Sequence, residues 1–207
     1  MVQSRSDPQG IEYLAPLLHR LSLPEALLSP LLAHARAVRE SAGRLGLVSP
    51  NDSQSIPSRH TADSLLFAIA RKPLRGEHWV DVGSGAGFPG LVLGCCFPQT
   101  RFTLAEPMKR RAGFLELQAA TLGLDNVEVS PRRVEELPSD FDVAVARALT
   151  DPSDALPALL NLVVPGGSAI VASGPSATLL PGATLVRPGD SVAVDSPGVL
   201  FMMSRGS

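Results

Sequence analysis

The stretch Asp81-Val82-Gly83-Ser84-Gly85-Ala86-Gly87-Phe88-Pro89-Gly90 decides the fold of this chain. It follows a short apolar run at 78–82 and opens a helical pattern over about 88–96. Glycines in such a turn let a ligand approach the backbone closely and allow conformations that a Cβ would forbid. The amide groups at the start of the helix carry partial positive charge. The stretch therefore predicts a ligand-binding turn between a strand and a helix.

The spacing of glycines and acids around this turn indicates the kind of ligand. The glycines alternate as G-x-G-x-G at Gly83, Gly85 and Gly87, whereas turns that bind a pyrophosphate have G-x-G-x-x-G. Asp81 could pair with a cationic cofactor that carries an amino-acid moiety. Glu106 ends the next strand candidate, where an acid can bind ribose hydroxyls. We expect these residues to line one cleft; a tight turn without a ligand is the alternative.

Strand and helix patterns alternate on both sides of the turn. Strand candidates fall at 78–82, 101–105, 127–130, 142–146, 168–172, 191–195 and 198–204, and helical patterns at about 59–70, 88–96, 107–122 and 152–163. This alternation predicts an α/β Rossmann-like fold whose mostly parallel, seven-stranded sheet has helices on both faces. The last two candidates lie too close together for a helical crossover, so we expect an antiparallel C-terminal strand.

The N-terminal part of the chain has a helical pattern of its own. Ser22 and Glu25 have capping-box spacing, and Pro30, after Ser29, is expected to restart the helix. A polar, turn-forming linker follows at 49–55. We therefore expect an N-terminal helical extension and linker at 1–58 and a cofactor-binding domain at 59–207.

Composition excludes several classes of protein. The 207 residues carry a net charge of −2, which argues against strong non-specific binding of nucleic acid but allows a local basic patch. No apolar run is long enough for a membrane helix, and Met1 to Gly10 lacks the pattern of a signal peptide. Cys95 and Cys96 are neighbours, fit no zinc site and are expected to be small core residues. We expect a cytoplasmic monomer without a metal or a membrane partner.

Charged residues follow the third and fourth strand candidates, at the sheet edge where α/β proteins bind ligands. The first group is Arg132-Arg133-Val134-Glu135-Glu136, and the second is Ala146-Arg147-Ala148. A solvated helix start is the alternative for the first group and the favoured interpretation for Glu136. For Arg147 the alternative is a salt bridge to a neighbouring carboxylate.

These motifs together resemble a known family. The glycine turn, Glu106 and the turn at 165–167 look like class I methyltransferases, which use S-adenosyl-L-methionine. Four segments and a looser fifth are similar to the RsmG (GidB) family, which methylates N7 of a guanine in bacterial 16S ribosomal RNA. The four are 59–64, 80–90, 133–136 and 146–148, and the fifth is 106–115 with its Arg110-Arg111 pair.

The resemblance implies roles for particular residues. It places cofactor contacts at Gly83, Phe88, Val134, Glu135 and Arg147. Contacts to RNA are expected at Arg59, His60, Arg110, Arg111 and Arg133, with a helix-cap or packing role as the alternative for His60. The implied partner is 16S ribosomal RNA or an assembly intermediate of the small subunit.

The chemistry of guanine N7 asks little of the protein. N7 carries a lone pair, so methylation needs neither a general base nor a covalent nucleophile, and we expect catalysis by positioning without a catalytic side chain. Because the methylated base gains positive charge, we assign Arg133 and Arg147 to the cofactor carboxylate or to RNA phosphate.

Two other functions remain open on the sequence. One is a methyltransferase of the same fold that acts on a small molecule or a protein. The near-neutral charge favours it, as does the C-terminal region, where only Arg187 and Arg205 follow residue 148 against four aspartates. The other is a degenerate paralogue without catalytic activity.

Overall fold

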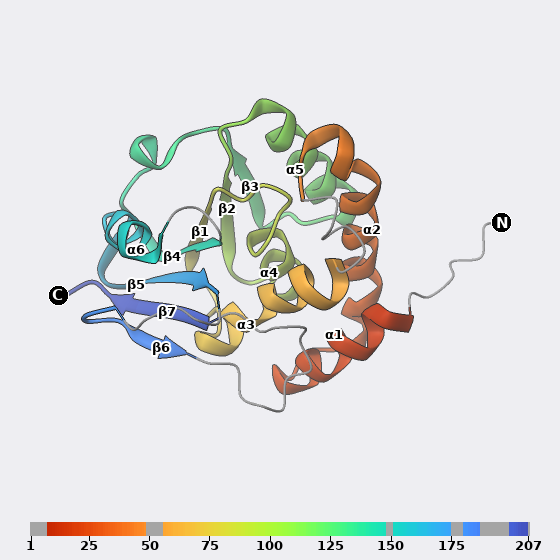
Figure 1. Ribbon diagram of the computed structural model, residues 1–207, viewed down its shortest axis with the longest axis horizontal. Coiled ribbons are helices and arrows are strands. Elements are labelled where there is room, and N and C mark those ends of the chain that lie inside the picture. The colour runs from red at the N-terminus through yellow and green to blue at the C-terminus, as the bar shows by residue number, and fades with distance from the viewer. Residues whose placement is uncertain (1–7, 49–55, 148–150, 175–179, 187–198, 207) are drawn as a thin grey trace.

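A mixed β-sheet forms the centre of the molecule (Figure 1). The computed structural model describes residues 8–48, 56–147, 151–174, 180–186 and 199–206. Among these residues, seven strands form one sheet in the order β3-β2-β1-β4-β5-β7-β6. Their bounds are β1 His78–Val82, β2 Arg101–Ala105, β3 Val127–Ser130, β4 Phe141–Arg147, β5 Val163–Ser173, β6 Thr184–Val186 and β7 Val199–Ser204. Strands β1 to β5 are parallel, and β7 is antiparallel to both β5 and β6.

The helices lie on both faces of this sheet (Figure 1). They are α1 Pro8–Arg20, η1 Glu25–Leu27, α2 Leu28–Leu45, a π-helical turn η3 Ile56–Thr61, α3 Ala62–Ala70, α4 Gly90–Cys96, α5 Lys109–Leu122, η4 Val134–Glu136 and α6 Pro152–Leu160. Helices α1 to α5 pack on one face and α6 on the other, so two separate apolar clusters form. The predicted α/β fold is confirmed.

Alternation along β1 explains both clusters. Trp79 points to the α1–α5 face and Val80 to the α6 face, and each is fully buried. Successive side chains of a strand point to opposite faces, so Asp81 lies on the same side as Trp79. The strand therefore delivers the Asp81 carboxylate to the face that α4 covers.

The N-terminal helices belong to the same core as the sheet. Leu14 of α1 and Leu31 and Val38 of α2 are buried in the cluster that contains Trp79 and Phe102. Within the described residues, no helix is both long enough and apolar enough to cross a membrane. The division of the chain at residue 58 stays a prediction.

Some local expectations differ from the structure. The capping box at Ser22 is wrong: this residue has a φ of 56°, its amide bonds to the His19 carbonyl, and the 3-10 helix η1 starts after Pro24. The predicted restart near Pro30 is confirmed, because α2 begins at Leu28. β5 starts five residues before the expected 168. The short β6 was not expected, and 191–195 lies outside the described residues.

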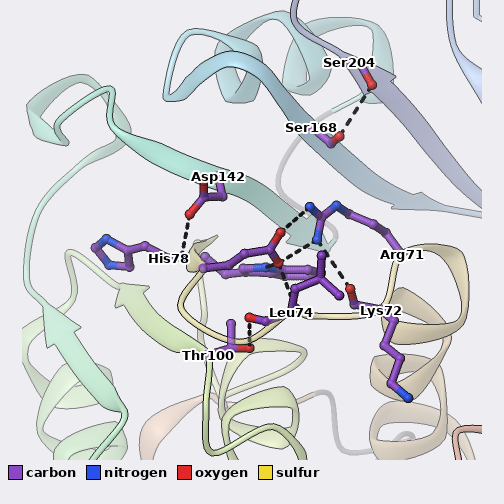
Figure 2. Close-up of polar contacts among 10 residues, drawn as sticks. Arg71, Lys72, Leu74, His78, Thr100, Asp142, Ser168 and Ser204 are labelled. Atoms are coloured by element: carbon purple, nitrogen blue, oxygen red, sulfur yellow. Dashed lines mark hydrogen bonds and ion pairs between the residues drawn. The ribbon is translucent and has the colours of Figure 1, made fainter.

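At the amino-terminal edge of the sheet, a cluster of polar contacts links the start of β1 to the end of α3 and to β4 (Figure 2). Arg71, at the end of α3, donates to both oxygens of Glu77 and lies over the Trp79 ring, 5.4 Å from its centroid. Glu77 also accepts from the Trp79 indole at 3.0 Å. The His78 amide donates to Asp142 of β4 at 2.7 Å. These contacts hold the start of β1 on the edge opposite to the glycine turn.

The cysteines are buried on α4, as predicted. Cys95 and Cys96 have 9% and 4% of their surface exposed and pack in the cluster on the α1–α5 face. Burial raises the pKa of Cys95 to about 11, so its thiol stays protonated at neutral pH. Their role as small core residues is confirmed.

Two glycines on the helices of one face provide a matched test of the packing. A Cβ at Gly94 of α4 would overlap the side chain of Val127 on β3, whereas a Cβ at Gly113 of α5 meets nothing within 4 Å. We expect Gly94→Ala to lower the free energy of unfolding by about 1–3 kcal/mol. Gly113→Ala should raise it by roughly 0.5–1 kcal/mol, because it removes backbone freedom from the unfolded chain. Urea denaturation measures both, and shifts of the same sign would contradict this packing.

Candidate functional site

A cleft of about 350 Å³ opens at the carboxyl ends of β1 and β2, at the lower end of the size range of small-molecule sites. Its lining includes four of the residues expected to bind a cofactor, Gly83, Glu106, Val134 and Glu135. Two of the arginines expected to contact RNA, Arg111 and Arg133, lie at the same cleft. The remaining lining residues are Val82, Ala105, Pro107, Met108 and Arg132.

The glycine turn reaches this cleft at Gly83, and three of its residues have positive φ. The φ angles of Gly83, Gly85 and Gly87 are 74°, 55° and 91°, in the region that residues with a Cβ rarely adopt. The amides of Gly83 and Ser84 both donate to the Ala105 carbonyl, at 2.9 and 3.1 Å. The alternating glycines thus fold the turn back against the end of β2.

Glu106 joins this turn to the loop that follows β2. Its side chain is 3% exposed, yet it lines the cleft. One carboxylate oxygen accepts from the Gly85 amide at 3.0 Å and the other from the Met108 amide at 2.9 Å. Because each carboxylate oxygen can accept two hydrogen bonds, Glu106 keeps acceptor capacity for the hydroxyl groups of a ligand.

Asp81 departs from the expected arrangement, because it is absent from the lining of the cleft. Its carboxylate is 1% exposed and accepts from the Gly90 amide at 2.8 Å, the first residue of α4. The positive end of the helix attracts this carboxylate inward. Burial raises the pKa of Asp81 to about 6, against the Gly90 bond and the charge of Arg147. Its other oxygen, Oδ1, has no hydrogen-bond partner among the described residues.

A second group of expected site residues gathers behind the turn. Arg147, at the end of β4, donates from Nη2 to His60 Nδ1 at 2.6 Å. Its guanidinium carbon lies 5.4 Å from the centre of the Phe88 ring, and the His60 ring stacks on Phe88 at 5.5 Å. Arg147, His60 and Phe88 do not line the cleft. Of the residues expected to bind the cofactor, four line the cleft, Phe88 and Arg147 lie in this cluster, and Asp81 and Gly85 belong to neither group.

Asp63 is a member of this cluster that sequence reasoning assigned no role. Its Oδ2 lies 3.9 Å from Nη1 of Arg147, a long ion pair of the kind considered as the alternative for this arginine. Burial raises the pKa of Asp63 to about 6, against the charges of Arg147 and Arg59. The signal was present in the string at 59–64, but the sequence did not show which of its side chains face inward.

His34 supports the glycine turn from α2 and was also missed. The ring is fully buried, with Nδ1 3.4 Å from Gln118 Oε1 and its centroid 5.2 Å from that of Phe88. A Cβ at Gly87 would lie 3.2 Å from its Nε2, so the imidazole fills the space under the turn. Burial lowers the pKa of His34 to about 4, although contacts to Gln118 and the Ala86 backbone oppose this shift.

The residues expected to contact RNA do not form one surface: Arg111 and Arg133 line the cleft, whereas His60 is buried. Arg111 donates to the Gly46 carbonyl at 2.6 Å, whereas Arg110 on the same helix lies in a groove against α2. Arg133 is exposed, and its amide donates to Glu136, as expected for a solvated helix start. Arg59 is exposed beside the buried His60.

Sequence comparisons place this site in a known context. Residues 28–178 match the family model described as rRNA small subunit methyltransferase G, GidB. Ribosomal RNA small subunit methyltransferase G of Clavibacter sepedonicus is 41% identical over 64% of this chain and 63% of the relative. The protein of the same name from Halorhodospira halophila is 36% identical over 84% of this chain and 77% of its own length. The matched region thus spans less than two thirds of the Clavibacter protein.

A solved structure shares the fold at low sequence identity. An O-methyltransferase from Thermotoga maritima that depends on S-adenosyl-L-methionine superposes with a TM-score of 0.55 at 16% identity. The match covers 70% of this chain and 65% of the other. At this identity the likeness establishes the fold, and the site residues rest on the geometry described above.

The buried imidazole predicts a pH dependence of stability. The unfolded chain protonates His34 below pH 6.5, whereas the folded chain does so only near pH 4, so this residue costs stability as the pH falls between those values. Between pH 6.5 and 5 we expect wild type to lose about 2 kcal/mol relative to His34→Gln. Denaturant unfolding at both pH values measures this difference in stability between the two proteins. The contributions of Asp63 and Asp81 cancel because both residues titrate in both proteins.

The matched control for this test is His19→Gln, which removes an exposed imidazole from α1. Its stability relative to wild type should be the same at the two pH values. A His34→Gln variant that also keeps a constant difference would contradict the neutral, buried histidine.

Proposed function

Because this chain belongs to the GidB family of rRNA small subunit methyltransferase G, we propose that it methylates RNA of the small ribosomal subunit with S-adenosyl-L-methionine. The proposed target is N7 of a guanine in 16S ribosomal RNA. The observation that carries the proposal is the cleft at the ends of β1 and β2, where the glycine turn and Glu106 meet within the matched region.

The residues of the cleft fit the cofactor. Glu106 has unused acceptor capacity for the two ribose hydroxyls, and Val134 offers an apolar surface for the adenine. The amino-acid end would extend past Gly83 towards Asp81, whose Oδ1 has no partner among the described residues and can accept from an ammonium group. When bound, the cofactor supplies an electrophilic methyl group on a sulfonium.

The chain's own residues need only position the two reactants. The lone pair of guanine N7 attacks without prior loss of a proton, so the site requires no general base. The base becomes positively charged, and an unpaired cation beside it would oppose the reaction. In this chain Arg147 is shared among Asp63, His60 and the Phe88 ring, so it is not an unpaired cation, and its assignment to an anion of the cofactor or the RNA stays a prediction.

Complementation tests the proposed substrate. Expression of this chain in a bacterial strain without its own enzyme of this family should restore one N7-methylguanine in 16S RNA. The mark is detected by borohydride reduction and aniline cleavage, which break the strand at that base. Loss of the mark while the purified protein still binds S-adenosyl-L-methionine would favour a small molecule or a protein as substrate. If the chain neither restores the mark nor binds S-adenosyl-L-methionine, the result would favour a degenerate paralogue without catalytic activity.

Glu106→Gln tests the cofactor site. The amide cannot accept from two hydroxyls and two backbone amides, so we expect the affinity for S-adenosyl-L-methionine to fall roughly tenfold to a hundredfold. Isothermal titration measures the affinity, and the thermal midpoint of each variant shows that the turn still folds. Glu116→Gln, which removes an exposed carboxylate of α5 outside the cleft, is the control. Equal affinities of the two variants for S-adenosyl-L-methionine would contradict a role of Glu106 in binding the cofactor.

A further inference from the structure

A second groove of about 380 Å³ lies between α2 and α5, which Figure 1 shows side by side. Its walls include Arg44 and Glu40 from α2 and Arg110, Phe114 and Leu117 from α5. Arg44 and Arg110 are both exposed, and Leu117 has 61% of its surface exposed. The groove therefore combines cations from two helices with an apolar strip.

Helices α2 and α5 both carry more basic than acidic residues. Helix α2 has three arginines, Arg36, Arg39 and Arg44, against one glutamate. Helix α5 begins with Lys109-Arg110-Arg111 and has one glutamate. The pair thus carries an excess of positive charge in a chain whose net charge is −2. A surface of this kind attracts polyanions even when the whole protein is acidic.

The two groove arginines, Arg44 and Arg110, have no polar partner among the residues that the structure describes. Arg71, Arg111 and Arg147 each bond to another group, but Arg44 and Arg110 make no hydrogen bond or ion pair with any residue that the structure describes. Both arginines line one groove, Arg44 from α2 and Arg110 from α5. Guanidinium groups placed in this way are suited to phosphate oxygens.

The groove and the cleft are lined by neighbouring residues of α5, Arg110 and Arg111. Arg111 lines the cleft, and its guanidinium donates to the carbonyl of Gly46, the residue that ends α2. Arg110, the next residue on α5, lines the groove. The cleft and the groove therefore lie close together at the start of α5.

We propose that the groove between α2 and α5 binds the RNA strand that flanks the target base. Arg44 and Arg110 each contact a phosphate, while the apolar strip at Leu117 lies under a ribose or a base. This inference rests on the proposed function, since it names the surface on which the same substrate docks. The sequence after residue 148 has two arginines against four aspartates, so α2 and α5 are the better source of cations for a polyanion.

The test compares two double variants with equal loss of charge. The groove variant, Arg44→Ala with Arg110→Ala, removes both arginines from the groove. The edge variant, Arg75→Ala with Arg101→Ala, removes two exposed arginines near the amino-terminal edge of β1 and β2. Binding to protein-free 16S RNA is measured over a series of salt concentrations. Loss of two phosphate contacts should make the slope of log K against log salt shallower by about 1.5 in the groove variant. The edge variant should keep the wild-type slope.

The readouts separate failure of this inference from failure of the proposed function. If wild type binds S-adenosyl-L-methionine but neither binds nor methylates the RNA, both proposals fall. If wild type methylates the RNA and the two double variants have equal slopes, only the groove is overturned. If the groove variant is weakened solely towards protein-containing assembly intermediates, the groove binds a protein and the RNA assignment is overturned. Equal affinity of all variants for the cofactor confirms that the cleft is intact.

Discussion

One buried carboxylate holds the two loops of the cleft at a set distance from each other: both oxygens of Glu106 accept backbone amides, one from Gly85 and one from Met108. These amides belong to the turn after β1 and the loop after β2, two strands that pair directly. Leaving either amide unpaired in this buried place would cost stability, so the loops move together or not at all. The shape of the cleft therefore depends on a contact between residues about twenty positions apart.

The backbone of this site could be predicted from the sequence. Positive φ at Gly83, Gly85 and Gly87 is a local demand that only the glycine spacing satisfies without strain, and it specifies the turn whatever packs around it. The alternation of apolar strands with amphipathic helices likewise determined the parallel order of β1 to β5. The boundary of β5 was missed because its first residues include Pro165-Gly166-Gly167, which has the composition of a turn.

The positions of the site side chains could not be predicted from the sequence, because they depend on contacts between residues far apart in the chain. Asp81 stood where an acid could face a ligand, but the Gly90 amide of α4 captures it, and that geometry exists only once the turn has folded. His34 lies more than fifty residues before Gly87 and meets it only because α2 crosses under the turn.

Net charge is a weak guide to what a protein binds, for a physical reason. Salt screens exposed charges beyond about 8 Å, so a ligand responds to the cations near its own path rather than to the sum over the molecule. In this structure Asp151 and Asp154 lie at the start of α6, on the opposite face of the sheet from α2 and α5. Acidic residues on one face and basic helices on the other would orient an approaching polyanion towards α2 and α5. A small net charge is therefore compatible with an RNA substrate, provided that the cations are gathered where the strand enters.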